Sequence, residues 1–247
     1  MIRYLLILWA TLATAFAGEA VAFDRANQQF HAGDFTGAAA GYEKILADDG
    51  PDAAVLYNLG NSYQTLKQYG RAILSYERAR TLTPRDPDLL ANLTMARKAA
   101  TAFEDAGSYP RLDALAGTLS RNEWSWLVAG SALALGGLSL LGGLVRIPPR
   151  TFAKRLVTTV AVVSCLAIAM GSAVLVLRRG EKGRGIIVTD NAPIRLSPFK
   201  TAAVAGNAAA GHSVRLGKKS GNFQYAELAA GNLQGWVAVE DAGLIAD

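Results

Sequence analysis

Two stretches without charged side chains decide the fold: WSWLVAGSALALGGLSLLGGLV at residues 124–145 and LVTTVAVVSCLAIAMGSAVLVL at residues 156–177. Each has 22 residues, and a helix needs roughly 20 apolar residues to cross the hydrocarbon of a bilayer. We therefore predict two transmembrane helices. Neither stretch contains Asp, Glu, Lys, Arg or His, which a transporter or channel normally carries inside the membrane. The pair is predicted to be an anchor and a helix-packing surface.

The ten residues between these stretches, 146–155, contain four basic side chains, no acidic one and the pair Pro148-Pro149. Proline ends a helix, and short loops rich in lysine and arginine stay in the cytoplasm. The sequence therefore predicts a helical hairpin with a cytoplasmic loop, whose two flanking segments share one compartment. A contrary signal is the basic run on the far side, Arg178, Arg179, Lys182 and Arg184.

The formal net charge of +5 comes from the hairpin and its flanks. Residues 18–122 carry 11 basic and 13 acidic side chains, and residues 185–247 carry five of each. A basic excess confined to membrane flanks argues against a nucleic-acid partner. The single cysteine, Cys165, cannot form an intramolecular disulfide, and His31 and His212 fall in different predicted domains. We expect no metal site and no cofactor.

Residues 1–17 have the features of a secretory signal peptide. Arg3 is followed by an apolar core over residues 4–13 and by the small-x-small pattern Ala15-Phe16-Ala17. We predict cleavage after Ala17, with an uncleaved anchor as the alternative. Export of the next segment agrees with a cytoplasmic hairpin loop, so the predicted location is the bacterial inner membrane with the N- and C-terminal domains in the periplasm.

An internal repeat with a period of about 34 residues runs from Glu19 to Thr83. The matching pairs are Ala26 with Gly60, Phe35 with Tyr69, Ala38 with Ala72, Tyr42 with Tyr76, and Glu43 with Glu77. In the second copy the large and small residues of a tetratricopeptide (TPR) repeat are Leu56, Leu59, Gly60, Tyr63, Ala72, Tyr76, Ala79 and Pro84. The stretch resembles that family, which implies stacked antiparallel helix pairs.

The predicted TPR domain, residues 18–104, has helices over residues 19–31, 36–47, 54–67, 71–82 and 87–103. The last looks like a capping helix. Such arrays usually need about three repeats to stand alone, so we expect this one to lean on a partner or on the membrane-proximal segment. Amides that could pair with an extended peptide make Asn27, Asn58, Asn61 and Gln64 the candidate protein-binding groove. For each of them an ordinary solvated position is the alternative.

A connector is predicted over residues 105–123, with a short amphipathic helix that lies either at the lipid interface or on the TPR domain. Its end, Ser120 to Glu123, matches a capping box for the first span. Small residues four apart favour close helix packing in lipid: Ala132 with Gly136 and Ser139 with Gly143 in the first span, and Ala167 with Gly171 in the second.

Residues 185–247 alternate short apolar segments with glycine, asparagine and proline, and predict five strands over residues 186–188, 194–196, 213–216, 223–228 and 233–239. Their order is similar to that of bacterial SH3-like domains, and the most specific match is Gly235-Trp236-Val237. The resemblance implies a small barrel that binds cell-wall peptide or another protein. Its candidate ligand face is Phe223, Tyr225 and Trp236, with barrel core as the alternative for these side chains.

The complete order, from signal peptide through TPR repeats and membrane hairpin to SH3-like domain, resembles the BatE-type proteins of bacterial aerotolerance (Bat) operons. The resemblance implies two kinds of partner: membrane proteins with von Willebrand factor A domains, and a MoxR-type ATPase in the cytoplasm. It also implies a stress-related assembly role. Membrane lipids are further expected partners.

The sequence therefore predicts a multidomain membrane protein with all-α TPR helical repeats, a transmembrane helical hairpin and a small all-β SH3-like barrel. The predicted function is a non-enzymatic scaffold that binds proteins. The alternative is an envelope protein that binds peptidoglycan through its SH3-like domain. We expect no enzymatic activity, because the chain shows no nucleophile beside a base, no metal cluster and no phosphate-binding loop.

Overall fold

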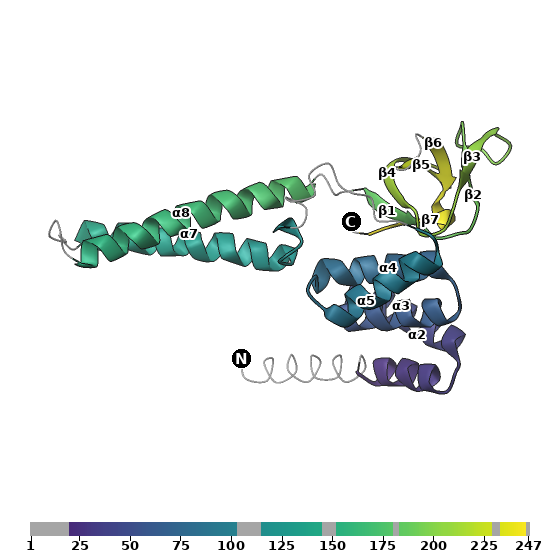
Figure 1. The fold of residues 1–247 in the computed structure, drawn as a ribbon, viewed down its shortest axis with the longest axis horizontal. Coiled ribbons are helices and arrows are strands. Elements are labelled where there is room, and N and C mark those ends of the chain that lie inside the picture. Colours follow the sequence, from purple (N-terminus) through teal and green to yellow (C-terminus); the bar gives the residue numbers. More distant parts are fainter. Residues whose placement is uncertain (1–19, 103–114, 145–151, 180–182, 229–232, 246–247) are drawn as a thin grey trace, which may run out of the picture. The chain divides into compact units, whose positions relative to one another are not determined.

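A computed structural model of the protein describes residues 20–102, 115–144, 152–179, 183–228 and 233–245 (Figure 1). The predicted signal peptide, the first part of the connector and most of the predicted cytoplasmic loop lie outside these ranges. The chain divides into two compact units: residues 1–106 together with 183–247, and residues 107–182.

Helices fill the N-terminal part of the first unit. Residues 20–31 are helical and are followed by α2 (Phe35–Asp48), α3 (Ala53–Thr65), α4 (Tyr69–Leu82) and α5 (Pro87–Ala99). Three of these helices begin at an aspartate whose side chain accepts a hydrogen bond from a backbone N–H of the first turn: Asp34, Asp52 and Asp86. Such a cap supplies a partner for one of the free amides at a helix start. The helix boundaries agree with the internal repeat.

Buried tyrosine and small residues pack the helices against one another. Ala38, Ala72, Tyr42 and Tyr76 are each at most 1% exposed. The ring of Tyr76 occupies the space where a Cβ on Gly60 would lie, so only glycine allows this close approach. The repeated pairs Ala38 with Ala72 and Tyr42 with Tyr76 are therefore core positions.

The C-terminal part of the first unit is an antiparallel sheet in the order β3-β2-β6-β5-β4-β1-β7. The strands are β1 (Arg184–Ile187), β2 (Ala192–Arg195), β3 (Val204–Ala208), β4 (Ser213–Ser220), β5 (Phe223–Leu228), β6 (Gln234–Ala238) and β7 (Ala242–Leu244), with the 3-10 helix η1 (Val239–Asp241) before β7. The sequence predicted five strands, and β3 and β7, the two edge strands, were missed. The sheet has its own core, centred on Ile187, Ile194, Ala226 and Val237.

The helical array and the sheet pack together at α4. Ile186 of β1 is 1% exposed and belongs to the core of the helices. A Cβ built on Gly70 would lie 2.7 Å from the Val188 carbonyl oxygen and 2.8 Å from that of Ile187, so the helix backbone contacts the β1 segment directly. The Arg78 Nε–H donates a hydrogen bond to the Leu244 carbonyl oxygen (2.9 Å). The array thus gains a neighbour from a distant part of the sequence.

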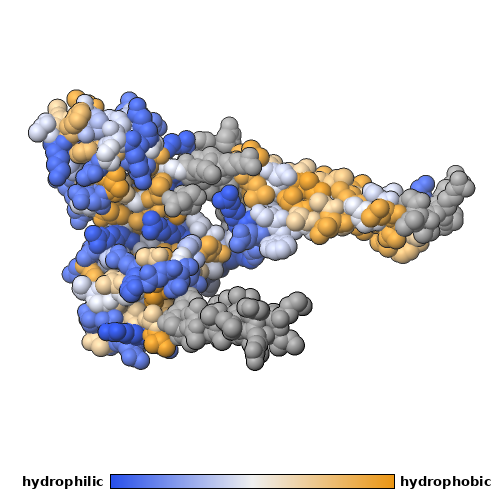
Figure 2. All heavy atoms as spheres, turned by 180° about the vertical axis from the view of Figure 1, so that it is seen from behind, coloured by the Kyte–Doolittle hydropathy of each residue, from blue (hydrophilic) through white to orange (hydrophobic). Residues whose placement is uncertain are grey.

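The second unit contains two long antiparallel helices, α7 (Arg121–Leu144) and α8 (Phe152–Arg179). Both are long and apolar enough to cross a membrane, over Arg121–Leu141 and Phe152–Leu177. Figure 2 shows hydrophobic residues along the surface of these helices, and Leu133 and Leu140 are 77% and 71% exposed. Exposed leucine at this density suits contact with lipid better than contact with water.

Two local predictions for this unit are confirmed by its contacts. In the capping box the Ser120 N–H donates to the Glu123 carboxylate (2.7 Å), and the Glu123 N–H donates to the Ser120 hydroxyl (3.3 Å). A Cβ on Gly171 would lie 2.6 Å from the Val128 side chain, so this glycine allows α8 to approach α7. A Cβ on Gly136 would meet no atom within 4 Å, so the prediction of close packing is wrong for this glycine of the first span. Trp124 is buried, and its Nε1–H donates to the Ala116 carbonyl oxygen (3.1 Å).

Candidate protein-binding site

The four predicted groove residues belong to a ladder of amide and tyrosine side chains that runs across the helices. In the first repeat, the Tyr42 hydroxyl donates to the Asn27 side-chain oxygen (2.6 Å). The Asn58 Nδ2–H donates to the same oxygen (3.2 Å). One asparagine therefore joins three helices: residues 20–31, α2 and α3.

The second repeat contains the same arrangement at equivalent positions. The Tyr76 hydroxyl donates to the Asn61 side-chain oxygen (2.7 Å), and the Asn92 Nδ2–H donates to that oxygen (2.9 Å). The Gln64 side-chain oxygen lies 3.1 Å from the Tyr76 hydroxyl. Asn27, Tyr42 and Asn58 thus correspond to Asn61, Tyr76 and Asn92, which identifies α5 as the first helix of a third repeat.

Sequence reasoning missed Asn92 and the repetition of the asparagines. The signal was present, because Asn27 and Asn61, and likewise Asn58 and Asn92, are separated by one full period of the repeat. The hydrogen bonds that these asparagines form between helices could not be read from the sequence, since they depend on which helices lie side by side.

The ladder leaves hydrogen-bonding groups available on half-buried side chains. In the described part of the chain, the Nδ2 of Asn27, the Nδ2 of Asn61 and the Nε2 of Gln64 donate no hydrogen bond. Side-chain amides held in place by their oxygens can donate to the carbonyl groups of an extended peptide. The arrangement can therefore both join the helices and present donors to a ligand.

Burial raises the pKa of three tyrosine hydroxyls in the array. It raises the pKa of Tyr42 and that of Tyr76. Burial, together with the adjacent Glu43 carboxylate, raises the pKa of Tyr63 to about 12. Tyr63 donates its O–H to Glu43, and the Arg71 guanidinium lies 5.5 Å from the centre of the Tyr63 ring. All three hydroxyls are hydrogen-bond donors at neutral pH.

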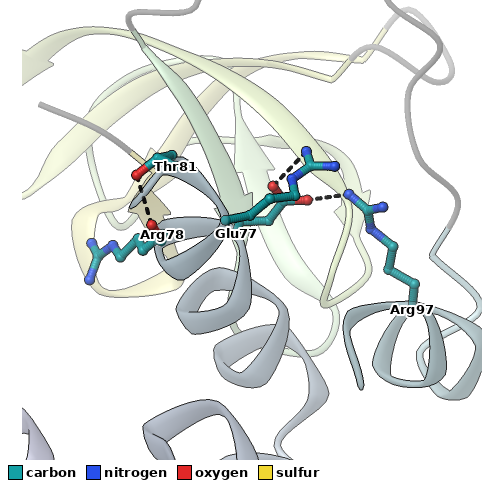
Figure 3. A network of polar contacts seen from close by, with 5 residues as sticks. Glu77, Arg78, Thr81 and Arg97 are labelled. Atoms are coloured by element: carbon teal, nitrogen blue, oxygen red, sulfur yellow. Dashed lines mark hydrogen bonds and ion pairs between the residues drawn. The ribbon is translucent and has the colours of Figure 1, made fainter. Parts of the chain in front are cut away.

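An ion-pair network fixes α4 to α5 (Figure 3). The Glu77 side chain is 3% exposed, accepts a hydrogen bond from Arg97 and forms an ion pair with Arg80 at 2.8 Å. Removing one member of a buried ion pair costs several kcal/mol, although the pair itself adds little net stability. Glu77 is thus a structural residue, and its repeat partner Glu43 has a different role beside Tyr63.

The predicted ligand face of the sheet divides into a buried and an accessible part. Phe223 is buried, whereas Tyr225 and Trp236 are half-buried neighbours on β5 and β6. Their rings meet edge to face, with centroids 5.6 Å apart. The Lys218 Nζ, which sequence reasoning did not select, lies 5.7 Å from the centre of the Trp236 ring.

Comparisons with known proteins support the helical part. Residues 53–86, which form α3, α4 and the turn to α5, match the family described as Tetratricopeptide repeat. No curated protein and no solved structure matches the chain. TPR repeats are protein-interaction modules, so the match indicates protein partners. No group of His, Cys, Asp or Glu that could hold a metal ion occurs among the described residues.

Proposed function

We propose that the protein is a non-enzymatic scaffold of the bacterial inner membrane, which holds partner proteins on a periplasmic body made of the TPR array and an SH3-like sheet. The observation that carries this proposal is the division of the chain: the helical array and the sheet form one unit, and both candidate spans lie in the segment inserted between them.

The same division supports a topology for the proposed membrane protein. Because the array and the sheet share core residues, they must fold in the same compartment. An even number of membrane crossings satisfies this condition, and two antiparallel spans provide it. The four basic side chains of residues 146–155 favour a cytoplasmic position for the loop between the spans. The array and the sheet then lie on the outer side.

Reporter fusions test the topology. A reporter after Glu104, one at Arg150 and one after Asp247 should be located outside, inside and outside, respectively. An inside location for the last reporter alone would separate the array from the sheet and contradict the proposal.

The partners that we propose are the von Willebrand factor A-domain membrane proteins of a Bat operon, with a MoxR-type ATPase on the cytoplasmic side. Co-purification of the full-length protein with these candidates is the direct test. Asn61→Ala and Gln64→Ala should reduce recovery of a partner bound in the groove, because each removes an amide donor that is available to a ligand. Gln28→Ala, at an exposed position of the first helix, is the matched control. Equal recovery with all three variants would exclude the groove as the binding site.

A second candidate function is binding of peptidoglycan. It is favoured by the accessible Tyr225 and Trp236 pair with Lys218 beside it, since aromatic faces next to a cation suit sugar and peptide ligands. Co-sedimentation of the full-length protein with purified cell wall should then fall with Trp236→Ala. Sedimentation that is the same for this variant and the unaltered protein would contradict this role.

A further inference from the structure

A cleft of about 360 Å³ lies between the helices and the sheet, away from the amide ladder. One wall is a stripe along α4, formed by Arg71, Leu74, Ser75 and Arg78. The opposite wall includes Glu240, Ala242 and Gly243, and α2 and α3 contribute Glu43 and Tyr63. Volumes of about 300–1,000 Å³ are typical of ligand sites.

The sheet wall of this cleft is the edge strand β7, whose carbonyl oxygen at Ala242 accepts no hydrogen bond within the described residues. The N–H and C=O of Ile187 are both bonded toward β4, to His212 (3.0 Å) and Gly211 (2.7 Å). Ala242, which lies opposite Ile187 in β7, therefore directs its own N–H and C=O away from β1. Ala242 is 8% exposed, and buried backbone groups nearly always have a partner.

The same edge already receives one donor from α4. Leu244 lies two residues after Ala242 and faces the same way, and its carbonyl oxygen accepts the Arg78 Nε–H. At Gly243 the strand contacts Leu74 of α4. At Ala242 the edge of the strand lines the cleft. An extended peptide backbone is the group that fits an open strand edge.

Charges on the walls specify the side chains of such a peptide. The Glu43 carboxylate accepts the Tyr63 hydroxyl, and Arg78 is bonded to Leu244. Arg71 and Glu240 come from opposite walls, and neither forms an ion pair within the described residues. Successive side chains of an extended strand point to opposite sides. A peptide along β7 would therefore place an acidic side chain toward Arg71 and the adjacent basic one toward Glu240.

We propose that this cleft binds an extended segment of a partner protein in which an acidic and a basic residue are neighbours, with its backbone paired to Ala242. The proposal rests on the protein-binding function above and adds a second site to it. A segment held here contacts α4 and β7 at once, so it also links the array to the sheet.

The test uses the full-length protein in lipid nanodiscs and fluorescein-labelled peptides, with fluorescence anisotropy at low ionic strength as the readout. The probes are Gly-Ala-Glu-Lys-Ala-amide, its order-swapped form Gly-Ala-Lys-Glu-Ala-amide, and neutral Gly-Ala-Gln-Gln-Ala-amide. At least one charged probe should bind with saturation and more tightly than the neutral one. N-methylation of its two central amides should abolish binding, because it removes the donors to Ala242.

Variants locate the site. Arg71→Gln and Glu240→Gln should each weaken binding of the charged probe about fivefold, the scale of one accessible ion pair. Arg215→Gln and Glu227→Gln, on an exposed cross-strand pair of β4 and β5, are matched controls and should leave binding unchanged. The proposal is wrong if no charged probe saturates, if the N-methylated probe binds equally well, or if both cleft variants bind like the unaltered protein. These results are independent of the partner co-purification assay, so the two proposals can fail separately.

Discussion

Replacing Gly70 by alanine tests directly whether the helical array packs against the sheet. The new Cβ would lie 2.7 Å and 2.8 Å from the carbonyl oxygens of Val188 and Ile187. A carbon and an oxygen normally approach to about 3.3 Å, so the helix and the β1 segment would have to separate by about 0.5 Å. Both contacts are to backbone, so no side-chain rotation can relieve them.

The cost follows from these contacts. Overpacking of this kind costs about 1–3 kcal/mol, and the better helix propensity of alanine returns up to about 1 kcal/mol. We therefore expect the free energy of unfolding of the first unit to fall by about 1–2 kcal/mol in Gly70→Ala. Hydrogen exchange should become faster at the amides of both α4 and β1.

The assay is urea unfolding of the full-length protein in detergent, followed by tyrosine fluorescence and circular dichroism. Gly137→Ala in α7, where a Cβ would meet no atom within 4 Å, is the matched control and should show no loss of stability. If Gly70→Ala were as stable as the unaltered protein and its β1 amides exchanged at the same rate, the packing of β1 on α4 would be refuted.

Three further predictions concern the side chains inside the array and the hairpin. Glu77→Gln should lower the free energy of unfolding by about 3 kcal/mol, because Arg97, whose side chain is 13% exposed, loses its carboxylate partner. A urea midpoint unchanged from that of the unaltered protein would exclude this role. The pKa of Tyr63 is raised to about 12 from an unfolded value near 10, so its contribution to stability is complete below about pH 10 and is lost as the pH rises toward 12. In Tyr63→Phe the thermal midpoint should therefore decline less between about pH 10 and pH 12 than in the unaltered protein. An equal decline in both proteins would contradict the contribution of Tyr63. Trp124→Phe removes the hydrogen bond to Ala116 and should lower the free energy of unfolding by about 1 kcal/mol. The measurement is the loss of helical circular dichroism on heating in detergent, and a melting temperature equal to that of the unaltered protein would contradict the contribution of this bond.

The periodic features of this chain were predictable from sequence, because they depend on residues that are close together along it. The helix boundaries, the capping box at Ser120 and the two apolar helices all follow from local composition. The contact between α4 and β1 was not predictable, since its signal is Gly70 packed against two carbonyl groups from the far end of the chain.

Two parts of the sheet also lacked a local signal. Strand β7 is short, and β3 reads Val-Ala-Gly-Asn-Ala, which combines a single valine with alanine, glycine and asparagine, residues of low strand propensity. Both strands form because they pair with a neighbouring strand, and not because their own residues favour the strand conformation. The structure brings the predicted groove residues together, but their bonds to Tyr42 and Tyr76 depend on helix packing and could not be read from the sequence.

The segment that forms the second unit interrupts the sequence of the first unit, which has a consequence for biosynthesis. The ribosome completes the helical array first and must then synthesise the segment Gly107–Lys182 before β1 emerges, which takes about 4–15 s at a rate of roughly 5–20 residues per second. Throughout that interval the apolar side chains of α4 that later receive Ile186 remain uncovered. Newly made chains therefore pass through a stage at which this apolar surface of the array is exposed, and the length of that stage is set by the time needed to synthesise the inserted segment.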